Sequence, residues 1–513
     1  MEVPKSQQPQ ISIAEFYNGK SVFVTGGLGF VGKVLVEKLL RSCPGIENIY
    51  LLCRSKKGKS INERLVEITS SPAFDLLREQ NPQALNKIIL IEGDVAMLEL
   101  GISNEDQQIL KDKVSIVMHS AATINFTEPL KVAVNTNLRS MRELIALANG
   151  MKNLKAFVHI STAYTNWFAM DVKEEVYPTE LDPHDVIEIC ERFPDNVIDR
   201  MTPTLFGKHT TTYTFTKALA ERLLHREGGK LPACIIRPSM VGGSTCEPKP
   251  GWTDSFGAST LFLYLAAKGA FRCVQHLERH PFDIIPVDKV INLAIAASVK
   301  ASYDRESGAK IMNPQVYHST SGNENPITLK ESFDVFVELG RIKPLNDVSW
   351  YPKTRVHKSA LLVDLDIYFL HYLPAYWMDF AAKLFGKKPR ALKSHQFIFK
   401  SYGDVRFASV VPYIFRTSNY KNVTKLMSPA EQKIFNFDPK TINWKTYMVD
   451  YYYGIKNFIL RDIPKDPEYM NAKIRRLKYT KNFVTGSLVA LSLTTVGTLS
   501  ALILRCRSDK KEK

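Results

Sequence analysis

The sequence predicts an α/β protein built on a doubly wound parallel sheet, followed by a mostly helical C-terminal domain and a C-terminal membrane helix. Three observations carry this prediction. A glycine-rich turn joins a short apolar strand to a helix near the N-terminus, strands then alternate with helices, and an uncharged apolar run stands close to the C-terminus. We place the sheet domain at 15–345, the helical domain at 346–470 and the membrane segment at 483–504.

The first predicted strand is the β-rich run Ser21–Thr25, and glycines at 26, 29 and 32 follow it directly. An amphipathic helix is expected over 33–40. The glycines permit a tight turn, a close approach of the backbone to a pyrophosphate, and close packing of the helix on the strand. Because strand, turn and helix occur in this order, the turn predicts a dinucleotide-binding loop.

The end of the second predicted strand, Ile49–Cys53, distinguishes between the two nicotinamide cofactors. NAD sites usually place an acidic residue there to hold the ribose 2′-hydroxyl. Here Arg54 follows the strand, and Ser55, Lys56 and Lys57 come next, without an acid. Because a guanidinium suits a bidentate contact with a 2′-phosphate, the sequence favours NADP over NAD. A solvated basic loop is the alternative.

Three further strands are predicted at 88–91, 114–118 and 156–160, with helical segments such as 130–148 between them. This alternation is typical of a parallel, doubly wound sheet. Asp94 follows the first of these strands. It stands where a contact with the adenine amine would lie, although an aspartate that caps the turn is the alternative.

The chemistry is expected from Tyr213 and Lys217, which form a YxxxK pattern at the start of a helix predicted over 214–226. Residues four positions apart share a helix face, and an ammonium beside a phenol lowers the pKa of the tyrosine. Tyr213 would then donate a proton near neutral pH, and Lys217 could also hold the nicotinamide ribose. Thr162 supplies a second hydroxyl for the substrate oxygen. A YxxxK pattern alone also occurs on exposed helices. The prediction therefore rests on its combination with the glycine turn, the strand order and Thr162.

The charge of the chain is concentrated at one end. The 513 residues carry a net charge of +16, and residues 471–513 hold ten basic and two acidic residues, which is +8. A nucleic-acid surface would instead concentrate charge on the folded part, so we expect no nucleic-acid partner. The seven cysteines are scattered without a CxxC pair, so we expect reduced thiols and no metal site.

The apolar run 483–504 has the length of a membrane helix. It contains 22 residues without a charge, and about 20 such residues span a bilayer. Five basic residues precede the run and five follow it, which favours a membrane segment over a buried core helix. Because the first 15 residues lack the apolar core of a signal peptide, we expect a tail anchor with the body in the cytosol.

The last residues of the sequence are compatible with two topologies of the tail and with two membranes. Lys510, Lys511 and Lys513 form an ending that resembles a dilysine retrieval signal of the endoplasmic reticulum. Such a signal works only from the cytosol, so either the apolar run returns as a hairpin or the lysines are a basic tail. We expect the endoplasmic reticulum membrane, with the catalytic domain facing the cytosol. The peroxisomal membrane is the alternative, because peroxisomal tail anchors also carry basic ends.

Five sequence motifs together identify a family resemblance. They are TGGLGFVG at 25–32, HSAAT at 119–123, HISTAY at 159–164, YTFTKALAE at 213–221 and IIRPSMVG at 235–242. They resemble the extended short-chain dehydrogenases/reductases, and more narrowly the alcohol-forming fatty acyl-CoA reductases, over about residues 15 to 470. Leu28 departs from the family pattern, which has threonine or serine there, and this puts one phosphate contact in doubt.

The resemblance implies a Rossmann-like fold and the NADPH-dependent reduction of a long-chain fatty acyl-CoA to a primary alcohol. An aldehyde would be the intermediate, and CoA would be released. The implied catalytic residues are Tyr213, Lys217, Thr162 and Asn137. For Asn137 a helix-interior asparagine bonded to backbone is the alternative. The expected cofactor-binding residues are Thr25, Gly26, Gly27, Gly29, Phe30, Gly32, Arg54, Asp94, Val95, Ala121, Lys217, Pro238 and Ser239.

The C-terminal third is expected to hold the acyl chain. Residues 361–385 are strongly aromatic and apolar, and Pro374 interrupts them. Three aspartates and a histidine in this stretch disfavour a transmembrane span. A helical hairpin or a membrane-surface segment fits better, with ordinary core packing as the alternative. Each buried CH₂ contributes about 0.8 kcal/mol, so an apolar cleft would discriminate between chain lengths.

Two other functions remain open at this point. One is a different extended reductase, acting on a steroid or converting a thioester only to an aldehyde. The helical C-terminal domain and the tail anchor argue against it. The other is a membrane-tethered NADP-binding scaffold without turnover. The presence of Tyr213, Lys217 and Thr162 together argues against a scaffold.

Overall fold

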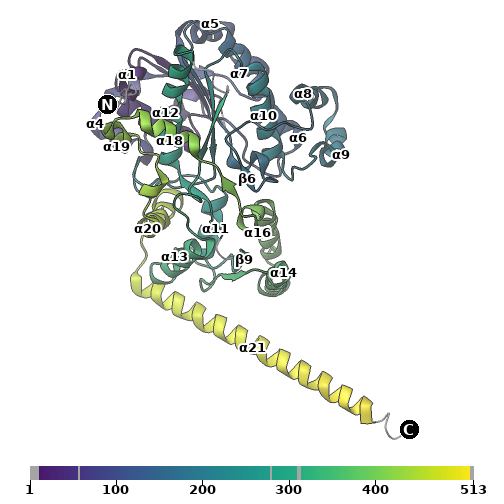
Figure 1. Ribbon diagram of the computed structural model, residues 1–513. Helices are drawn as coiled ribbons and strands as arrows, with labels where there is room; N and C mark the ends of the chain where they lie inside the picture. Colours follow the sequence, from purple (N-terminus) through teal and green to yellow (C-terminus); the bar gives the residue numbers. More distant parts are fainter. Residues whose placement is uncertain (1–10, 56–57, 278–279, 309–313, 509–513) are drawn as a thin grey trace, which may run out of the picture.

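A seven-stranded parallel sheet forms the centre of the molecule (Figure 1). The computed structural model describes residues 11–55, 58–277, 280–308 and 314–508, and the side chains of 258 and 488–508 lie outside that description. The strands of this sheet are β1 (Ser21–Thr25), β2 (Ile49–Cys53), β3 (Ile88–Glu92), β4 (Val114–His119), β5 (Ala156–Ile160), β7 (Ala233–Pro238) and β11 (Gln315–Ser319).

The strand order is β11-β7-β5-β4-β1-β2-β3. From β1 the chain moves outward through β2 and β3, and it then crosses back to place β4 on the other side of β1. The carboxyl ends of β1 and β4 therefore flank the point where the strand order reverses. In open parallel sheets this crevice is where ligands bind. The prediction of a doubly wound, Rossmann-like sheet is thus confirmed.

The strands are apolar on both faces because helices cover both faces of the sheet. In β1, Val22 and Val24 are buried on the face covered by α2 (Phe30–Ser42) and α12 (Val287–Glu306). Phe23 between them is buried on the opposite face, with α7 (Ser140–Asn149) and α10 (Thr212–Glu227). Successive side chains of a strand point to opposite faces. This explains why the strand sequences are continuous apolar runs instead of alternating patterns.

The helices of the first 345 residues connect these strands. The α-helices are α1 (Ile13–Tyr17), α2 (Phe30–Ser42), α3 (Ile61–Thr69), α4 (Asp75–Gln80), α5 (Asn104–Lys113), α6 (Leu130–Ala133), α7 (Ser140–Asn149), α8 (Pro183–Arg192), α9 (Asp195–Leu205), α10 (Thr212–Glu227), α11 (Ala258–Ala267), α12 (Val287–Glu306) and α13 (Leu329–Ile342). The 3₁₀ segments are η1 (Pro72–Phe74), η2 (Pro82–Lys87), η3 (Leu98–Gly101) and η5 (Ala163–Asn166).

The helix predicted over 130–148 is interrupted. A π-helical segment, η4 (Val134–Arg139), lies between α6 and α7. Such a segment inserts one residue into the helical ladder and is frequent at functional sites. It carries Asn137, whose side chain is buried. Hydrophobic periodicity alone does not reveal this irregularity, because both flanking helices keep the ordinary pattern.

The C-terminal region is mostly helical, as expected. Its helical elements are α14 (Ala360–Ile367), η6 (Tyr368–Tyr372), α15 (Leu373–Leu384), α16 (Ala391–Val405), α17 (Phe407–Val410), α18 (Ser418–Leu426), α19 (Pro429–Ile434), η7 (Pro439–Thr441), α20 (Trp444–Gly454), η8 (Ile455–Ile459) and α21 (Pro467–Ser508). The small strands outside the main sheet are β6 (Asp171–Val172), β8 (Met240–Gly242), β9 (Cys273–Gln275), β10 (Ile284–Pro286), β12 (Arg355–His357) and β13 (Ile414–Phe415).

Short strand pairs join this region to the first 345 residues. β13 pairs in parallel with β6, and β12 pairs in parallel with β9. Pro374 does not break the helix, contrary to the sequence expectation. It lies at the start of α15, directly after the π-helical η6, and the chain turns back only between 385 and 390. A π segment lacks the usual bond to the preceding turn, which accommodates the proline.

The long helix α21 leaves the body at the end of the molecule where α13 and α14 lie (Figure 1). Its first turns pack through Met470 and Ile474 on Val348. The helix includes the predicted membrane segment, but the side chains of 488–504 lie outside the described residues. Among the helices searched within the described part of the chain, none is both long and apolar enough to cross a membrane.

Candidate active site

The turn between β1 and α2 is shaped so that only glycine fits at two positions. Gly26 has a φ of +73°, and a Cβ there would lie 2.6 Å from the Ala121 nitrogen. A Cβ on Gly32 would lie 2.1 Å from the Gly26 oxygen. The N-cap of α2 is Gly29, which offers no side-chain cap. The first amides of α2 therefore remain available to an anion, as a pyrophosphate requires.

The predicted Tyr213 and Lys217 lie in the first two turns of α10. Thr211 caps this helix by accepting a hydrogen bond from the Thr214 nitrogen at 3.2 Å. The Lys217 ammonium is buried and donates to the Ile160 carbonyl, 2.8 Å away at the end of β5. The Tyr213 ring packs edge-on against Phe126, with ring centroids 5.5 Å apart.

The protonation of these two side chains differs from the sequence expectation. Burial raises the pKa of Tyr213 to about 12, while a hydrogen bond with Thr162 acts in the opposite direction. Burial lowers the pKa of Lys217 to about 8, and Glu221 opposes that change. The expectation of a lowered Tyr213 pKa is therefore wrong for the protein alone, because desolvation by burial outweighs the hydrogen bond with Thr162. Tyr213 still holds its proton at neutral pH and can donate it.

Asn137 links two elements of the site. Its Oδ1 accepts a hydrogen bond from the Thr123 nitrogen at 2.9 Å, and its Nδ2 donates to the Thr123 oxygen at 3.1 Å. The same Nδ2 donates to Thr216 Oγ1 at 3.0 Å, next to Lys217 in α10. The amide thus ties the segment after β4 to the catalytic helix. This arrangement describes a positioning residue.

Arg54 and Asp94, which were predicted to contact the 2′-phosphate and the adenine amine of the cofactor, form an ion pair with each other. Arg54 is 56% exposed, and Asp94 also accepts a hydrogen bond from the Ala96 nitrogen at 3.0 Å. Sequence reasoning missed Arg64 of α3, which donates to the Arg54 carbonyl. The carboxyl ends of β2 and β3 therefore carry two guanidinium groups beside the carboxylates of Asp94 and Glu92.

One cavity of about 360 Å³ brings most of the predicted residues together. Tyr213, Lys217 and Thr162 line it, as do the glycines 26, 29 and 32. Arg54, Asp94 and Asn137 are not among its lining residues. The C-terminal region contributes Val405, Phe407 and Ala408 to the lining. The remaining lining residues are Phe30, Val31, Ser120, Ala122, Ile124, Phe126, Ile160, Ser161, Tyr164, Thr214, Pro238, Ser239, Met240, Val241, Ser255, Gly257, Ser259 and Thr260.

The remaining predicted cofactor residues are buried or lie beside this cavity. The Thr25 hydroxyl is 2.7 Å from His119 Nδ1, and it accepts a hydrogen bond from the Ala121 nitrogen at 3.4 Å. Gly27 packs against Leu51, since a Cβ there would lie 2.8 Å from its side chain. Val95 packs at the edge of the core on the α7 and α10 side of the sheet.

A small apolar cavity of about 40 Å³ lies beside the larger one. The two cavities share Met240, Ser259, Val405 and Ala408. Beyond these shared residues the small cavity is lined almost wholly by apolar and aromatic side chains. They are Phe262, Leu263, Phe271, Val274, Phe282, Leu329, Phe333, Tyr402 and Ser409. The site is therefore polar near Tyr213 and apolar toward α13 and α16.

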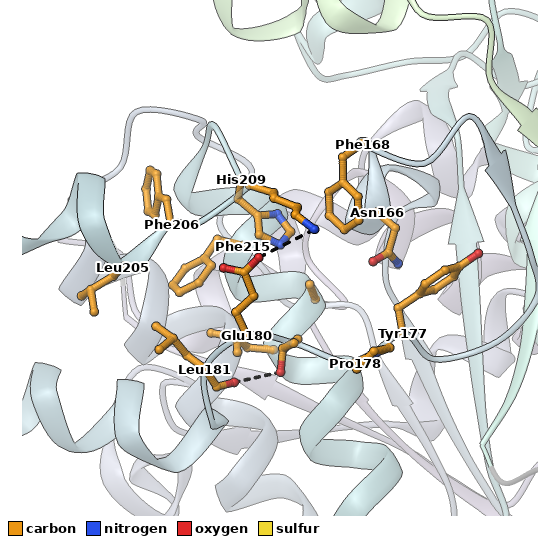
Figure 2. A pocket seen from close by; sticks show the side chains of 14 residues that line it. Asn166, Phe168, Tyr177, Pro178, Glu180, Leu181, Leu205, Phe206, His209 and Phe215 are labelled. Atoms are coloured by element: carbon orange, nitrogen blue, oxygen red, sulfur yellow. Dashed lines mark hydrogen bonds and ion pairs between the residues drawn. The ribbon is translucent and has the colours of Figure 1, made fainter.

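A separate cavity of about 290 Å³ lies on another face of α10, where Phe215 and Leu219 contribute to its lining (Figure 2). Its polar lining includes Asn166, Tyr177, Thr179, His209 and the ion pair between Lys208 and Glu180, whose charged atoms are 3.9 Å apart. Burial lowers the pKa of His209 to about 4, so this imidazole is neutral. None of the predicted catalytic residues lines this cavity.

Three further groups near the site were not predicted. Glu221, four residues after Lys217, forms a fully buried ion pair with Arg237 of β7, with a 3.0 Å hydrogen bond from Nε. His119 and His159 stack beneath the site with ring centroids 5.1 Å apart. The i, i+4 spacing of Lys217 and Glu221 on one helix face was a usable signal. The stacked histidines have no sequence signal, because they meet only through strand pairing.

Comparisons with known proteins match most of the chain. Two family profiles, both described as "Male sterility protein", match residues 24–294 and 370–462. Fatty acyl-CoA reductase 1 from Rattus norvegicus is 36% identical over 479 residues, covering 92% of both chains. The protein of the same name from Xenopus laevis is 37% identical over 479 residues, again 92% of both chains. Fatty acyl-CoA reductase 2 from Mus musculus is 34% identical over 475 residues, 92% of this chain and 91% of its own.

Among solved structures, the terminal R domain from the myxalamid PKS-NRPS pathway aligns with a TM-score of 0.55 at 16% identity, covering 88% of this chain and 93% of its own. The reductase domain of a non-ribosomal peptide synthetase from Mycobacterium tuberculosis gives 0.54 at 20% identity, with coverages of 87% and 93%. These likenesses show the fold alone. The two profiles and the relatives of 34–37% identity show that this chain belongs to the fatty acyl-CoA reductase family.

Proposed function

We propose that this protein reduces long-chain fatty acyl-CoA to a primary fatty alcohol, through an aldehyde, with NADPH as the reductant and CoA as the second product. The observation that carries the proposal is the cavity lined by the glycine turn, Tyr213, Lys217 and Thr162, together with the small apolar cavity that shares four of its lining residues. The two cavities offer a place for a dinucleotide, a proton donor and an acyl chain. Family membership supplies the acyl-CoA substrate class.

The reaction needs a carbonyl oxygen to be held while negative charge develops on it. Bound NADPH supplies the hydride in each of the two reductions. The hydroxyls of Tyr213 and Thr162 line the same cavity and can donate hydrogen bonds to that oxygen. When the first adduct expels the CoA thiolate, the carbonyl of an aldehyde forms again. In the second reduction Tyr213 transfers its proton to the alkoxide, giving the alcohol, and solvent restores that proton.

Lys217 would hold the cofactor in position and would carry positive charge beside Tyr213. Its buried ammonium is fixed on the Ile160 carbonyl, one residue before the loop that carries Ser161 and Thr162. From there it can reach a nicotinamide ribose and stabilise negative charge on the phenol during proton transfer. Asn137 keeps α10 and the segment after β4 at a fixed separation through Thr216 and Thr123.

The preference for NADPH rests on the charges that follow β2. Arg54 and Arg64 lie near each other there, and the only acidic partner described for the Arg54 side chain is Asp94. A 2′-phosphate brings two negative charges that guanidinium groups bind well. It would take over Arg54 from Asp94, which leaves that carboxylate for the adenine amine.

We also propose a membrane attachment through the run 483–504, with the reductase in the cytosol, where NADPH and acyl-CoA are available. The support is the uncharged sequence of 22 residues, with five basic residues on each side. The endoplasmic reticulum is the membrane we propose, and the peroxisomal membrane is the alternative.

Product analysis tests the proposed reaction. The purified full-length protein is incubated with palmitoyl-CoA and NADPH, and lipids are extracted and identified. We expect hexadecanol and free CoA from the wild type, and a loss of about 10²–10⁴ in rate for Tyr213→Phe with NADPH binding retained. Hexadecanal as the final product would indicate a one-step reductase. If no acyl-CoA supports NADPH oxidation, the protein is a scaffold and the proposal is wrong.

A further inference from the structure

The helices between 361 and 397 carry an unusual density of exposed apolar side chains. Twelve large apolar or aromatic residues in this stretch are exposed, among them Trp377 (65%), Phe380 (55%), Phe385 (79%) and Phe397 (65%). We call the outward face of α14, η6, α15 and the start of α16 the hairpin surface. Exposed apolar groups of this density are rare on proteins that face only water.

The helices of the hairpin have two apolar faces. One face is buried against the body, and the other is the hairpin surface. Val363, His371 and Ala375 of the same helices are fully buried toward the body. In α16, Phe399 packs on His371 with ring centroids 4.6 Å apart, while Phe397 points outward. A helix that is apolar on all sides normally lies in a non-aqueous environment. Core packing therefore explains one face of the hairpin and leaves the other without a function.

The charged side chains at the turn of the hairpin are mostly basic, whereas α14 at its start carries Asp364, which is 60% exposed and lies 3.7 Å from Arg406. Residues 373–400 hold six basic residues and one acidic residue, Asp379. Asp379 is already engaged, because it accepts hydrogen bonds from three backbone amides at the start of α16. Lys383, Lys387 and Lys388 are exposed at the turn between α15 and α16. Aromatic side chains beside basic residues match the boundary between acyl chains and anionic headgroups.

The hairpin also connects this surface to the acyl cavity. Tyr402 and Val405, further along α16, line the small apolar cavity beside the larger one. The helix α21, which leads toward the predicted membrane segment, leaves from the same end of the molecule (Figure 1). A bilayer that receives α21 therefore lies on the side where the hairpin surface is exposed.

We propose that the hairpin surface docks onto the lipid bilayer, with the α14–α15 helix lying in the membrane interface and the basic turn on the headgroups. This contact is separate from the segment 483–504 and does not cross the membrane. It places the acyl end of the active site next to the phase in which long-chain alcohols dissolve. A bilayer fits this surface better than a protein, because the apolar groups of α15 and α16 stand beside six basic residues and one acidic residue, Asp379, that already accepts backbone hydrogen bonds.

Tryptophan fluorescence can report on this surface alone. The chain has five tryptophans, at 167, 252, 350, 377 and 444, so none lies in α21 or the segment 483–504. The full-length protein is reconstituted into vesicles of phosphatidylcholine and phosphatidylserine with or without brominated phosphatidylcholine, which quenches only tryptophans that touch acyl chains. Trp377→Phe is the test variant. Trp444→Phe is the matched control, because the Trp444 indole donates to the Asn325 carbonyl at 3.0 Å, away from the hairpin.

We expect brominated lipid to quench the wild type and Trp444→Phe, and Trp377→Phe to lose most of that quenching. Acrylamide, a quencher dissolved in the water, should reach Trp377 less when vesicles are present. Equal bromine quenching in the wild type and Trp377→Phe would overturn the proposal. If Trp377 is then shielded from acrylamide in a concentration-dependent way, a second copy of the chain covers the surface. If acrylamide reaches it fully in vesicles, the surface faces water.

Discussion

Burial raises the pKa of Tyr213 and lowers the pKa of Lys217, and the resulting protonation states suit a reduction. Tyr213 keeps its proton because a phenolate is poorly solvated in the cavity, and its pKa rises to about 12. Lys217 loses affinity for its proton for the same reason, and its pKa falls to about 8. A reductase needs a proton on the donor and positive charge beside it, so both requirements hold only below the lysine pKa.

The pKa of Lys217 predicts how turnover depends on pH. Lys217 is charged below its pKa of about 8 and neutral above it, so kcat/KM should fall as the pH rises through about 8. Because kcat/KM reports groups of the free enzyme, the protein without cofactor is the relevant state. Initial rates with palmitoyl-CoA between pH 6 and 10 measure this limb. A profile that stays flat to pH 10 would exclude Lys217 as the titrating group.

The charge that follows β2 predicts the cofactor preference. Arg54→Glu should weaken NADPH binding by about tenfold or more relative to NADH, because a like charge beside a phosphate costs several kcal/mol when desolvated and less at an exposed site. Arg54→Lys keeps the charge but loses the bidentate guanidinium, so it should change the ratio less than Arg54→Glu does. Cofactor affinities of both variants, measured by titration, decide the matter. An unchanged NADPH/NADH ratio in Arg54→Glu would make Arg54 an ordinary surface residue.

At the scale of elements, the helix α10 is held from three sides. Thr211 caps its start, Asn137 of the π segment η4 bonds Thr216 within it, and Glu221 ties its middle to Arg237 of β7. The Tyr213 hydroxyl and the Lys217 ammonium stand on the first two turns of this helix. A rigid helix preserves the geometry between a proton donor and a substrate oxygen.

The small apolar cavity beside α13 predicts how chain length is selected. Phe333→Ala should deepen it and favour longer acyl chains, whereas Val274→Phe should fill it and favour shorter ones, since both residues line that cavity. Each additional buried CH₂ contributes about 0.8 kcal/mol, or about fourfold. Competition assays with acyl-CoA substrates of different length measure both shifts. General destabilisation cannot move the two variants in opposite directions, so a shared direction would contradict the assignment.

How much the sequence reveals differs between elements for physical reasons. The bounds predicted for β1, β2 and β5 agree with the structure, because each is a short apolar run with a turn signal after it. The π segments η4 and η6 were missed, since an inserted residue does not alter the local composition. The ion pair between Arg54 and Asp94 was missed as well. It depends on β2 and β3 lying side by side, which sequence spacing does not show.

At the scale of the whole molecule, the candidate site lies between the sheet and the helices that carry the hairpin surface. The polar side of the site lies at the carboxyl edge of the sheet, and its apolar side reaches helices whose outer face is the hairpin surface. The Leu361–Phe385 stretch was expected to be a hairpin or a membrane-surface segment. The structure gives a helix with a π segment that returns through α16, and the membrane contact stays a proposal.

Truncation after Lys481 separates the two proposed contacts. We expect the shortened protein to be extracted from membranes by alkaline carbonate, because the uncharged run is gone, while its activity in detergent is retained. Reversible binding to anionic vesicles should remain through the hairpin surface and fall with salt. Flotation of both forms with the same vesicles measures this. If carbonate fails to extract the truncated protein, the run 483–504 is not the principal anchor.

The topology of the tail needs a C-terminal epitope on the full-length protein in sealed microsomes. Protease added outside should leave the epitope intact when 483–504 crosses the bilayer once. A digested epitope would place both ends in the cytosol, so that the run would return as a hairpin and the terminal lysines could serve as a retrieval signal.

The central claim is that one site transfers two hydrides to the same carbon atom. The most direct test supplies palmitoyl-CoA and NADPH that carries deuterium at the transferred position, and then determines the mass of the hexadecanol. We expect two deuterium atoms on the carbinol carbon and none elsewhere, with two cofactors oxidised for each CoA released. Hexadecanol with a single deuterium, or deuterated hexadecanal that accumulates without alcohol, would contradict it.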